Sequence, residues 1–567
     1  MAASGLSTRG ACAHRVHARV VIRASSPAGP PGPPTSRTPF APRVIVMPKP
    51  DVKSLCRLPL ALMLGLALVG CKSTVAPSGD CKPVAVNKGS EGLSLTISDK
   101  VVKSMGPEYF GFNLENSEFQ LSLWDAERQQ VRPEVTRFLK QHFPGAVYRY
   151  PGGTTANYHR WKTSVGKVAT RKSVRINDWI ELPRIEFGVD EYLDFVGEIN
   201  GQVWYVLNLK GDIDRLADID KLSGEAADLV RHIGERKVPV VRWELGNELD
   251  RFEEKWTSDL YVNRAQTVME AVRKVDPKAR FVAMMADFDA QSDRGINASQ
   301  YNTALAKGLK DSGITEFAQH LYYDGEPDGP PVTNRIDHLC QSIADAEKGG
   351  VPAKDVGFWV TEHARWPEGQ GEAWNRNWRQ SGDLGASIGL ADLIITTTQL
   401  PQVKGTDLHA LHGSTGPWPM FHQPEGASAY HPSVPLHAYA LLRETLLPQV
   451  LETKTSSGNP SSYGGGYSAR GTVMTNQDRS RYSVWAVNRD KAATEITLNM
   501  PALAGKTLKA NLASISGGVT QINNYDRQII DGPKRQSIQL SFDAQGVARY
   551  TVAPNSVSGL SFAGTTR

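Results

Sequence analysis

The chain has 567 residues, of which 40% are hydrophobic, 22% charged and 8% aromatic. This length exceeds one small domain and predicts about two to four domains, or fewer where one of them is a barrel of about 250 residues. The formal net charge of +5 is small for the length, so no nucleic-acid partner is expected.

The amino-terminal 90 residues show targeting features instead of the pattern of a folded domain. Residues 1–46 are rich in Pro, Ser, Arg and Ala, a composition that predicts disorder, and we expect translation to start at Met47. Residues 47–70 then combine a charged start with the apolar segment 58–69, which is typical of a signal peptide and too short to span a membrane. The segment leads into Leu-Val-Gly-Cys ending at Cys71, which resembles the lipobox of bacterial lipoproteins.

This pattern predicts that Cys71 becomes a lipidated first residue and anchors the protein to a membrane of the bacterial cell envelope. Lys72 is compatible with sorting to the outer membrane. Residues 71–90 are expected to form a tether. A plain secretory signal with an incidental cysteine, giving a secreted protein, is the alternative.

Cysteine usage offers little support for a disulfide framework or a metal site. Of the five cysteines, two belong to the leader and one is the lipid site, which leaves Cys81 and Cys340. Cys81 falls in the predicted tether, so no bridge between the two is expected, although both remain available for one. No CxxC or HExxH pattern occurs, and we predict neither a metal nor an organic cofactor.

From residue 109 to 413, short apolar segments alternate with segments of helical periodicity, as in a parallel α/β fold. The predicted strands are 109–115, 147–153, 203–209, 240–248, 280–286, 317–323, 356–362 and 407–412. The predicted helices are 127–142, 189–199, 222–236, 256–275, 299–311, 336–348 and 382–399. Eight strands with intervening helices predict a (β/α)8 barrel over residues 105–440, with a doubly wound open sheet as the alternative.

After residue 440 the pattern changes to short alternating strands separated by Gly, Ser and Asn. The predicted strands are 482–488, 494–499, 507–512, 537–542, 548–552 and 558–562. Their spacing predicts an antiparallel β-sandwich over residues 441–567. Residues 91–104 also look like a strand and are expected to join this sandwich. The fold class is therefore α/β, a barrel with an additional sandwich domain.

Two glutamates end predicted barrel strands, Glu248 on the fourth and Glu362 on the seventh. Catalytic groups of such barrels lie at the carboxyl ends of the strands, and a pair of carboxylates facing one sugar can hydrolyse a glycosidic bond. Asn247, directly before the first glutamate, suits a hydrogen bond to a sugar hydroxyl. Glu248 then suits the general acid/base, with a pKa raised by burial or by its partner, and Glu362 the nucleophile.

Other polar residues lie at neighbouring strand ends. His320 and Tyr322 end the sixth strand, where a tyrosine hydroxyl could donate to the nucleophile and keep it ionised. Arg149 ends the second strand and could brace a carboxylate, and Glu115 ends the first. Packed core side chains and a tight barrel turn are the alternative interpretation of these positions.

Five segments carry a resemblance to a known family. They are Tyr-Phe-Gly-Phe-Asn-Leu-Glu at 109–115, Arg-Tyr-Pro-Gly-Gly at 149–153, Phe-Gly-Val-Asp-Glu-Tyr at 187–192, Glu-Leu-Gly-Asn-Glu at 244–248 and His-Leu-Tyr at 320–322. Residues 105–415 thereby resemble retaining glycoside hydrolases of clan A, in particular the family 51 α-L-arabinofuranosidases and then the heparanase-like β-glucuronidases. The resemblance implies an acid/base role for Glu248, a nucleophile role for Glu362, and substrate contacts or bracing for Glu115, Arg149, Asn247, His320 and Tyr322.

Three departures from the family pattern concern the substrate. Thr154 replaces the Asn that follows Pro-Gly-Gly, Arg365 lies in a His-Ala-Arg segment where the family has Trp-Asn, and the eighth strand reads Leu-His-Ala-Leu-His at 408–412. Thr154 and Arg365 are predicted substrate contacts. Together with His159, Arg160 and Lys162 they support an alternative, a hydrolase of acidic glycans.

The expected function is hydrolysis of a polysaccharide or oligosaccharide by an arabinofuranosidase-like enzyme through a covalent glycosyl-enzyme. The alternatives are a β-glucuronidase or heparanase-like hydrolase, a carbohydrate-binding lipoprotein without catalysis, and a polysaccharide lyase. Both glutamates are present, which favours catalysis by paired carboxylates over the last two.

Overall fold

A computed structural model describes residues 81, 92–175, 181–251, 256–288, 296–413, 416–424, 427–457, 468–523 and 530–564. These belong to one compact unit, residues 77–567. The predicted leader, the lipid site Cys71 and the tether apart from Cys81 lie outside the described residues. Among the helices of the described part, none combines the length and apolar character that crossing a bilayer requires.

Eight parallel strands close into a barrel in chain order, so the predicted (β/α)8 barrel is confirmed. The barrel strands are β2 (Phe110–Asn113), β5 (Val147–Tyr150), β8 (Gln202–Leu207), β11 (Val240–Leu245), β12 (Phe281–Met284), β13 (Glu316–Tyr323), β14 (Gly357–Arg365) and β15 (Val403–His409). Most of their residues are apolar or aromatic and buried, as expected for parallel strands covered by helices. The order of strands brings their carboxyl ends to one rim.

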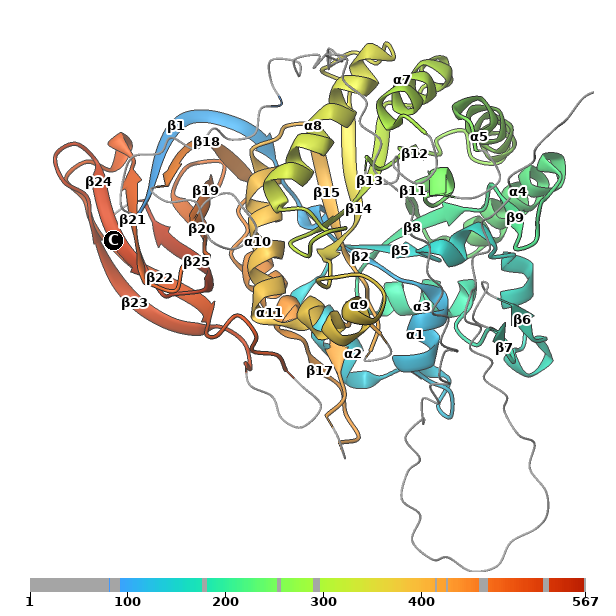
Figure 1. Ribbon diagram of the computed structural model, residues 1–567, viewed down its shortest axis with the longest axis horizontal. Helices are drawn as coiled ribbons and strands as arrows, with labels where there is room; N and C mark the ends of the chain where they lie inside the picture. Colours follow the sequence, from blue (N-terminus) through green and yellow to red (C-terminus); the bar gives the residue numbers. More distant parts are fainter. Residues whose placement is uncertain are drawn as a thin grey trace, which may run out of the picture. The chain divides into compact units, whose positions relative to one another are not determined.

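Helices surround the barrel (Figure 1). They are α1 (Asn116–Ser122), α2 (Pro133–His142), α3 (Val189–Glu198), α4 (Ile219–Glu235), α5 (Ser258–Arg273), α7 (Ala298–Leu309), α8 (Val332–Lys348), α9 (Glu372–Asn377), α10 (Leu384–Thr398) and α11 (Val434–Glu444). The seven predicted helices agree with α2, α3, α4, α5, α7, α8 and α10 to within a few residues, except that α2 begins later. Helix α11 was not predicted.

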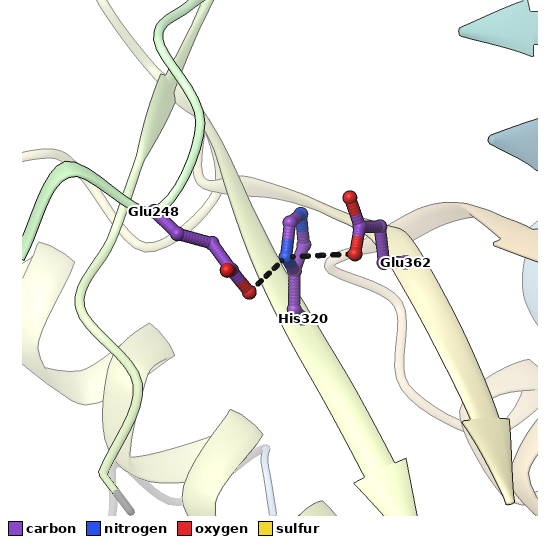
Figure 2. A group of neighbouring side chains, drawn as sticks. All are labelled: Glu248, His320 and Glu362. Carbon is purple, nitrogen blue, oxygen red and sulfur yellow. Dashed lines mark hydrogen bonds and ion pairs between the residues drawn. The ribbon is translucent and has the colours of Figure 1, made fainter. Parts of the chain in front are cut away.

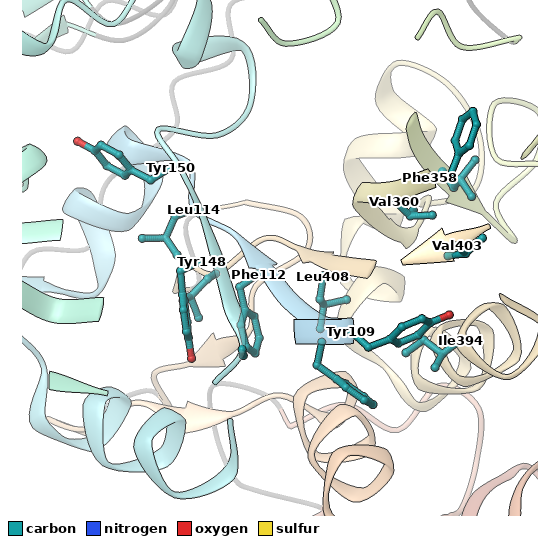
Figure 3. Packing of buried hydrophobic residues seen from close by; sticks show 14 of the residues in the cluster. Tyr109, Phe112, Leu114, Tyr148, Tyr150, Phe358, Val360, Ile394, Val403 and Leu408 are labelled. Atoms are coloured by element: carbon teal, nitrogen blue, oxygen red, sulfur yellow. The ribbon is translucent and has the colours of Figure 1, made fainter. Parts of the chain in front are cut away.

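The alternation of side chains along β2 and β5 separates core from site. Phe112 on β2 faces Tyr148 on β5 in the register, and their fully buried rings stack with centroids 5.4 Å apart (Figure 3). The next residues, Asn113 and Arg149, are also register partners. Because successive side chains of a strand point to opposite faces, this packing outside the barrel directs Asn113 and Arg149 into its interior.

Apart from four two-stranded sheets, the strands outside the barrel form one nine-stranded sheet in the order β23-β22-β25-β20-β19-β18-β1-β21-β24, in which only β1 and β21 pair in parallel. Their bounds are β1 (Leu93–Ser104), β18 (Gln449–Ser457), β19 (Ala469–Thr475), β20 (Arg481–Asn488), β21 (Thr494–Asn499), β22 (Thr507–Ser516), β23 (Lys534–Ser541), β24 (Val547–Val552) and β25 (Ser556–Ala563). The hydrogen bonds thus join all nine strands where a sandwich of two sheets was expected, and the sheet encloses its own apolar core. Strand β1, drawn in blue among orange and red strands, pairs with β18 (Figure 1).

Helix α10 connects the barrel to this sheet. All its residues are buried, and it contacts barrel strand β14 on one side and β19 and β20 on the other. Asp392 of α10 accepts from Arg489 at 2.7 Å and lies 2.6 Å from Arg470. Arg489 also reaches Asp324 at the end of β13, at 3.0 Å. Ion pairs buried in this way lose much of their stabilisation to desolvation, so their main effect is to fix the geometry of the contact.

A disulfide joins Cys81 to Cys340 of α8, so the expectation that these two cysteines stay unpaired is wrong. The two residues are 259 positions apart in sequence but only 5.5 Å apart between their Cα atoms. Sequence spacing carried no information on this contact, because the fold brings together two residues that lie far apart along the chain.

Candidate active site

The two predicted catalytic glutamates lie at the barrel rim, one within a strand and the other in the loop that follows a strand. Glu362 lies within β14, which continues to Arg365. Glu248 follows β11, which ends at Leu245, and has φ = 45°. A non-glycine residue with positive φ is uncommon and is held by its surroundings. The predicted strand ends are therefore corrected by three residues in each case, in opposite directions.

The carboxylates of Glu248 and Glu362 face each other across His320. An oxygen of each glutamate and a ring nitrogen of His320 all lie within 4.8 Å of one another. The Nδ1 atom of His320 is 2.7 Å from Oε1 of Glu248 and 3.4 Å from Oε2 of Glu362 (Figure 2). This separation corresponds to retaining glycosidases, whose carboxyl groups are about 5–5.5 Å apart, and is shorter than the separation of about 6.5–9.5 Å in inverting enzymes.

Arg149 links the buried polar side chains at the base of the site by hydrogen bonds. Its guanidinium is fully buried and donates two hydrogen bonds to Glu244, at 2.7 and 2.9 Å. The remaining N–H groups reach Glu362 at 2.9 Å, Asn113 at 2.7 Å and Asn247 at 2.8 Å. A planar guanidinium with five donors can meet several acceptors at fixed angles, so Arg149 fixes the relative positions of these four side chains.

Glu362 is held as an ionised carboxylate. Its Oε1 accepts from Arg149 and, at 3.2 Å, from Asn113, and its Oε2 accepts from the Tyr322 hydroxyl at 2.8 Å. Burial alone would raise the pKa of Glu362, but its electrostatic interactions with His320, His409 and Arg149 outweigh burial and lower this pKa. The geometry gives Glu362 an ionised form and two fixed oxygens, as a nucleophile requires.

His409 and Asn113 were not singled out from the sequence. The amide nitrogen of Asn113 donates to Nδ1 of His409 at 2.8 Å, and this Nδ1 lies 3.6 Å from Glu362. Burial lowers the pKa of His409 to about 4, so the ring is neutral at pH 7. Both residues end barrel strands, and this position was the signal that could have identified them.

Glu248 has a different environment from the one expected. Its Oε1 pairs with His320 and with Nη1 of Arg251 at 2.9 Å. Burial raises the pKa of Glu248, but Arg251 and then His320 exert a larger opposite effect, and the net pKa is lowered. The prediction of a raised pKa is therefore wrong for the protein without substrate, because the sequence did not reveal the contact with Arg251.

Glu115 and Thr154 lie at the opposite side of the rim. Glu115 precedes α1, and Thr154 begins the 3₁₀ turn Thr154–Asn157. Burial, followed by the negative charges of Glu118 and Glu362, raises the pKa of Glu115 well above its usual value. Gly153 has φ = 62°, and a Cβ atom there would collide with the Glu115 carboxyl group, so glycine suits the close packing of this group against the turn.

Asn247 is oriented by Asn157, which sequence analysis did not identify. The Asn247 backbone N–H donates to Asn157 Oδ1 at 3.0 Å, and Asn157 Nδ2 donates to the Asn247 carbonyl at 2.6 Å. Arg149 holds the side-chain oxygen of Asn247. The predicted hydroxyl ligand is thus fixed at both its backbone and its side chain.

The basic residues predicted near the rim are committed to acidic partners. Arg365 donates to Asp383 at 3.0 Å and is buried, so its contacts disagree with the predicted role in substrate binding. Arg160 pairs with Glu225 and with Asp212 at 2.9 Å, and Lys162 pairs with Asp228. These ion pairs neutralise the charges of Arg160, Lys162 and Arg365, which had supported an acidic sugar as the substrate.

An aromatic wall was missed as well. Trp366, Trp374 and Trp418 contact one another with ring centroids 5.2–5.9 Å apart, and Trp366 and Trp418 contact the Tyr322 ring at 5.2 and 5.3 Å. All three tryptophans are partly exposed. Because Tyr322 also binds Glu362, this wall lies beside the nucleophile, where a sugar face could stack on it.

The same rim contains a set of side chains with the composition of a metal site. Among the described residues, Glu248, His320 and Glu362 could each offer one ligand atom to an ion. The Nδ1 atom that faces both carboxylates already makes a 2.7 Å hydrogen bond to Glu248. The arrangement is accounted for by hydrogen bonding between a histidine and two acids.

Sequence comparison supports the predicted resemblance. Residues 140–321 match the family model for the α-L-arabinofuranosidase 1 domain. The chain is 25% identical over 236 residues to an intracellular exo-α-(1→5)-L-arabinofuranosidase of Streptomyces lividans, a match that covers 39% of this chain and 33% of that protein. A Bacillus subtilis protein with the corresponding description is 26% identical over 238 residues, covering 39% and 45%. The matched region thus spans less than half the length of either relative.

Comparison with solved structures shows a shared fold. The thermostable family 51 α-L-arabinofuranosidase of Thermotoga petrophila superimposes with a TM-score of 0.66 at 17% identity, over 83% of this chain and all of that one. The chain is therefore α-L-arabinofuranosidase-like in the sequence of its barrel and in its fold. The resemblance predicted from five short segments is confirmed.

Proposed function

We propose that this chain, whose barrel is α-L-arabinofuranosidase-like, is a retaining glycoside hydrolase with Glu362 as nucleophile and Glu248 as general acid/base. One observation carries the proposal: carboxylate oxygens of the two glutamates lie within 4.8 Å on either side of His320. Two carboxylates at this spacing can act on one anomeric carbon but leave no room for the attacking water that an inverting enzyme holds between sugar and base.

In the first step, a carboxylate oxygen of Glu362 attacks the anomeric carbon while Glu248 gives its proton to the glycosidic oxygen. The bond from that carbon to the leaving oxygen breaks, and an ester between sugar and Glu362 forms. In the second step, the ionised Glu248 takes a proton from water as the water oxygen attacks the same carbon and releases Glu362. Asn247, held by Arg149, is positioned to bind the neighbouring sugar hydroxyl.

For the glycone we favour a neutral α-L-arabinofuranosyl residue of a polysaccharide or oligosaccharide. The match of the barrel to arabinofuranosidases supports this choice. The uronide alternative relied on Arg365 and on the cluster after the second strand, and the acidic partners of Arg160, Lys162 and Arg365 weaken it.

A panel of 4-nitrophenyl glycosides at one pH tests the glycone, comparing α-L-arabinofuranoside with β-D-glucuronide, β-D-xyloside and β-D-glucoside. We expect turnover of the arabinofuranoside. Turnover of the glucuronide alone would establish the acidic alternative, and an unsaturated product absorbing in the near ultraviolet would indicate a lyase.

Glu362→Ala tests the mechanism. We expect almost complete loss of turnover and recovery with azide, which attacks from the vacated face and gives a glycosyl azide of inverted anomeric configuration. Unchanged turnover of Glu362→Ala would contradict the assignment. Glu248→Ala is the matched control, because azide should there react with the glycosyl-enzyme and give a product of retained configuration.

We further propose that Cys71 carries a lipid anchor in the bacterial cell envelope, at the outer membrane, where the enzyme would meet polysaccharide. The disulfide between Cys81 and Cys340 supports an oxidising compartment. Labelling cells with an alkyne fatty acid should tag the protein started at Met47, and Cys71→Ser should remove the label and release the protein from membranes. Cys56→Ser, in the leader, is the matched control, and labelling that survives Cys71→Ser would overturn the anchor.

A further inference from the structure

Arg251 lies beside the proposed acid/base and has no role in the mechanism above. It ends the short turn Leu249–Arg251 that follows Glu248. Its Nη1 is 2.9 Å from Oε1 of Glu248, and its Nη2 is 2.9 Å from Oδ2 of Asp287. The Arg251 side chain is 30% exposed, whereas that of Glu248 is 14% and that of Asp287 5% exposed. Arg251 is thus the most open member of this ion cluster.

This contact opposes the first catalytic step. Glu248 must be protonated to donate to the leaving group, and a guanidinium at 2.9 Å favours the ionised form. His320 acts in the same direction, while the negative charges of Glu115 and Glu362 oppose it. The charged or titratable groups that face Glu248 are Arg251, His320, His409, Tyr322, Glu115 and Glu362. Of the cations among them, Arg251 makes the largest contribution.

An anion from the substrate would remove this opposition. Arg251 contacts Glu248, and among the described residues no ion pair joins it to Glu362. The acid/base must reach the glycosidic oxygen, so a cation paired with Glu248 is expected nearer to the leaving group than to the sugar bound to Glu362. A carboxylate there could form a bidentate pair with the guanidinium.

We propose that Arg251 is a specificity-determining residue that binds a carboxylate on the leaving-group sugar, so that the preferred substrate is a neutral glycone linked to a uronic acid. The inference rests on the proposed function and adds the chemical class of its leaving group. When the substrate carboxylate pairs with Arg251, the guanidinium shares its charge with the substrate, and Glu248 gains its proton more readily. The acidic substrate thereby promotes the protonation that its own cleavage requires.

Matched substrates test this directly in the wild-type protein. We compare an α-L-arabinofuranosyl uronic acid disaccharide with its methyl ester, which has the same linkage and no charge. We expect kcat/KM to be about ten- to hundredfold higher for the acid, as befits one charge-assisted pair. Equal turnover of acid and ester would overturn the inference.

Variants then assign the preference to Arg251. Arg251→Gln should bring the ratio of acid to ester close to one, Arg251→Lys should keep part of it, and the exposed control Arg128→Gln should leave it unchanged. A preference that survives in folded Arg251→Gln would also overturn the inference.

The pH profile separates this role from a purely structural one. Activity falls as pH rises through the pKa of Glu248, because the acid must be protonated. Arg251→Gln should therefore move the alkaline limb of kcat/KM to higher pH, and a limb that does not move would count against the inference. Turnover of the ester and of an aryl arabinofuranoside, dependent on both glutamates, would leave the proposed function standing even then. If no arabinofuranoside is turned over, the proposed function and this inference both fail.

Discussion

Glu362 and Glu248 carry the same carboxylate group, but the partners of Glu362 are buried and the main charged partner of Glu248 is partly exposed. Glu362 lies within a strand and is held by Arg149, Asn113 and Tyr322, all buried side chains from other barrel strands. Glu248 lies three residues past its strand at positive φ, and its strongest charged partner, Arg251, is partly open to solvent. The charge of the proposed nucleophile is therefore fixed by buried partners, whereas that of the proposed acid/base depends on a partner that we propose a substrate can bind.

The difference follows from what each residue must do. A nucleophile performs best in one fixed, ionised form, and buried donors supply this permanently. An acid/base must change its protonation state twice in each turnover, so a permanent cation beside it would hinder one of the two steps. A cation such as Arg251, which we propose pairs with the substrate during catalysis, avoids this conflict.

The largest effect is expected from Arg149→Met, which removes the buried guanidinium beside Glu362. This change leaves Glu244 and Glu362 buried without their ion pair, which we expect to reduce the free energy of unfolding by about 3–5 kcal/mol and to abolish turnover. Arg251→Met, on the open side, should cost less, because Glu248 keeps His320 and Asp287 keeps Arg335 as a partner. Denaturant unfolding measures both values, and similar losses in the two variants would remove the distinction.

Glu248→Ala tests whether Glu248 supplies the proton to the leaving group. We expect a loss of about 10²–10⁴ in kcat/KM for a glycoside with a poor leaving group. A dinitrophenyl glycoside needs no protonation to depart, so its kcat/KM should fall far less. Steady-state kinetics on the two substrates checks this, and an equal loss on both would assign the acid elsewhere.

Tyr322→Phe should give a smaller effect on the nucleophile side. The hydroxyl stabilises the ionised Glu362 through a 2.8 Å hydrogen bond, and its loss is expected to lower kcat/KM about tenfold. Activity falls as pH falls through the pKa of Glu362, which is lowered in the intact site. Removing the donor raises this pKa, so the acidic limb of the pH profile should move to higher pH. A shift to lower pH would contradict the assignment.

The smallest effect is expected from Lys162→Ala. Lys162 is half exposed and already paired with Asp228, so its removal should change kcat/KM for any glycoside less than about twofold and stability by no more than about 1 kcal/mol. A selective loss of glucuronide turnover in this variant would revive the acidic glycone.

Much of the barrel was predictable because its strands are short apolar segments in chain order. The segment 356–362 is apolar until Thr361 and Glu362, and β14 spans Gly357–Arg365. The bounds at the rim were less accurate, since β11 ends where Gly246 takes positive φ and the chain leaves the sheet. Strands β18 and β19 and helix α11 were missed, and β19 and most of α11 are buried on all sides, so they show no amphipathic alternation.

The sequence alone determined the class of the fold and predicted that the two acids meet, since a closed barrel with strands in chain order brings every carboxyl end to one rim. Only the tertiary structure decided which partner each acid has. Asn113 reaches Glu362 across 249 positions of sequence, and Arg149 across 213, whereas Arg251 captures Glu248 from three residues away. These contacts depend on side-chain positions to within a few ångström, which hydrophobic periodicity does not specify, and they fix the charge on each acid.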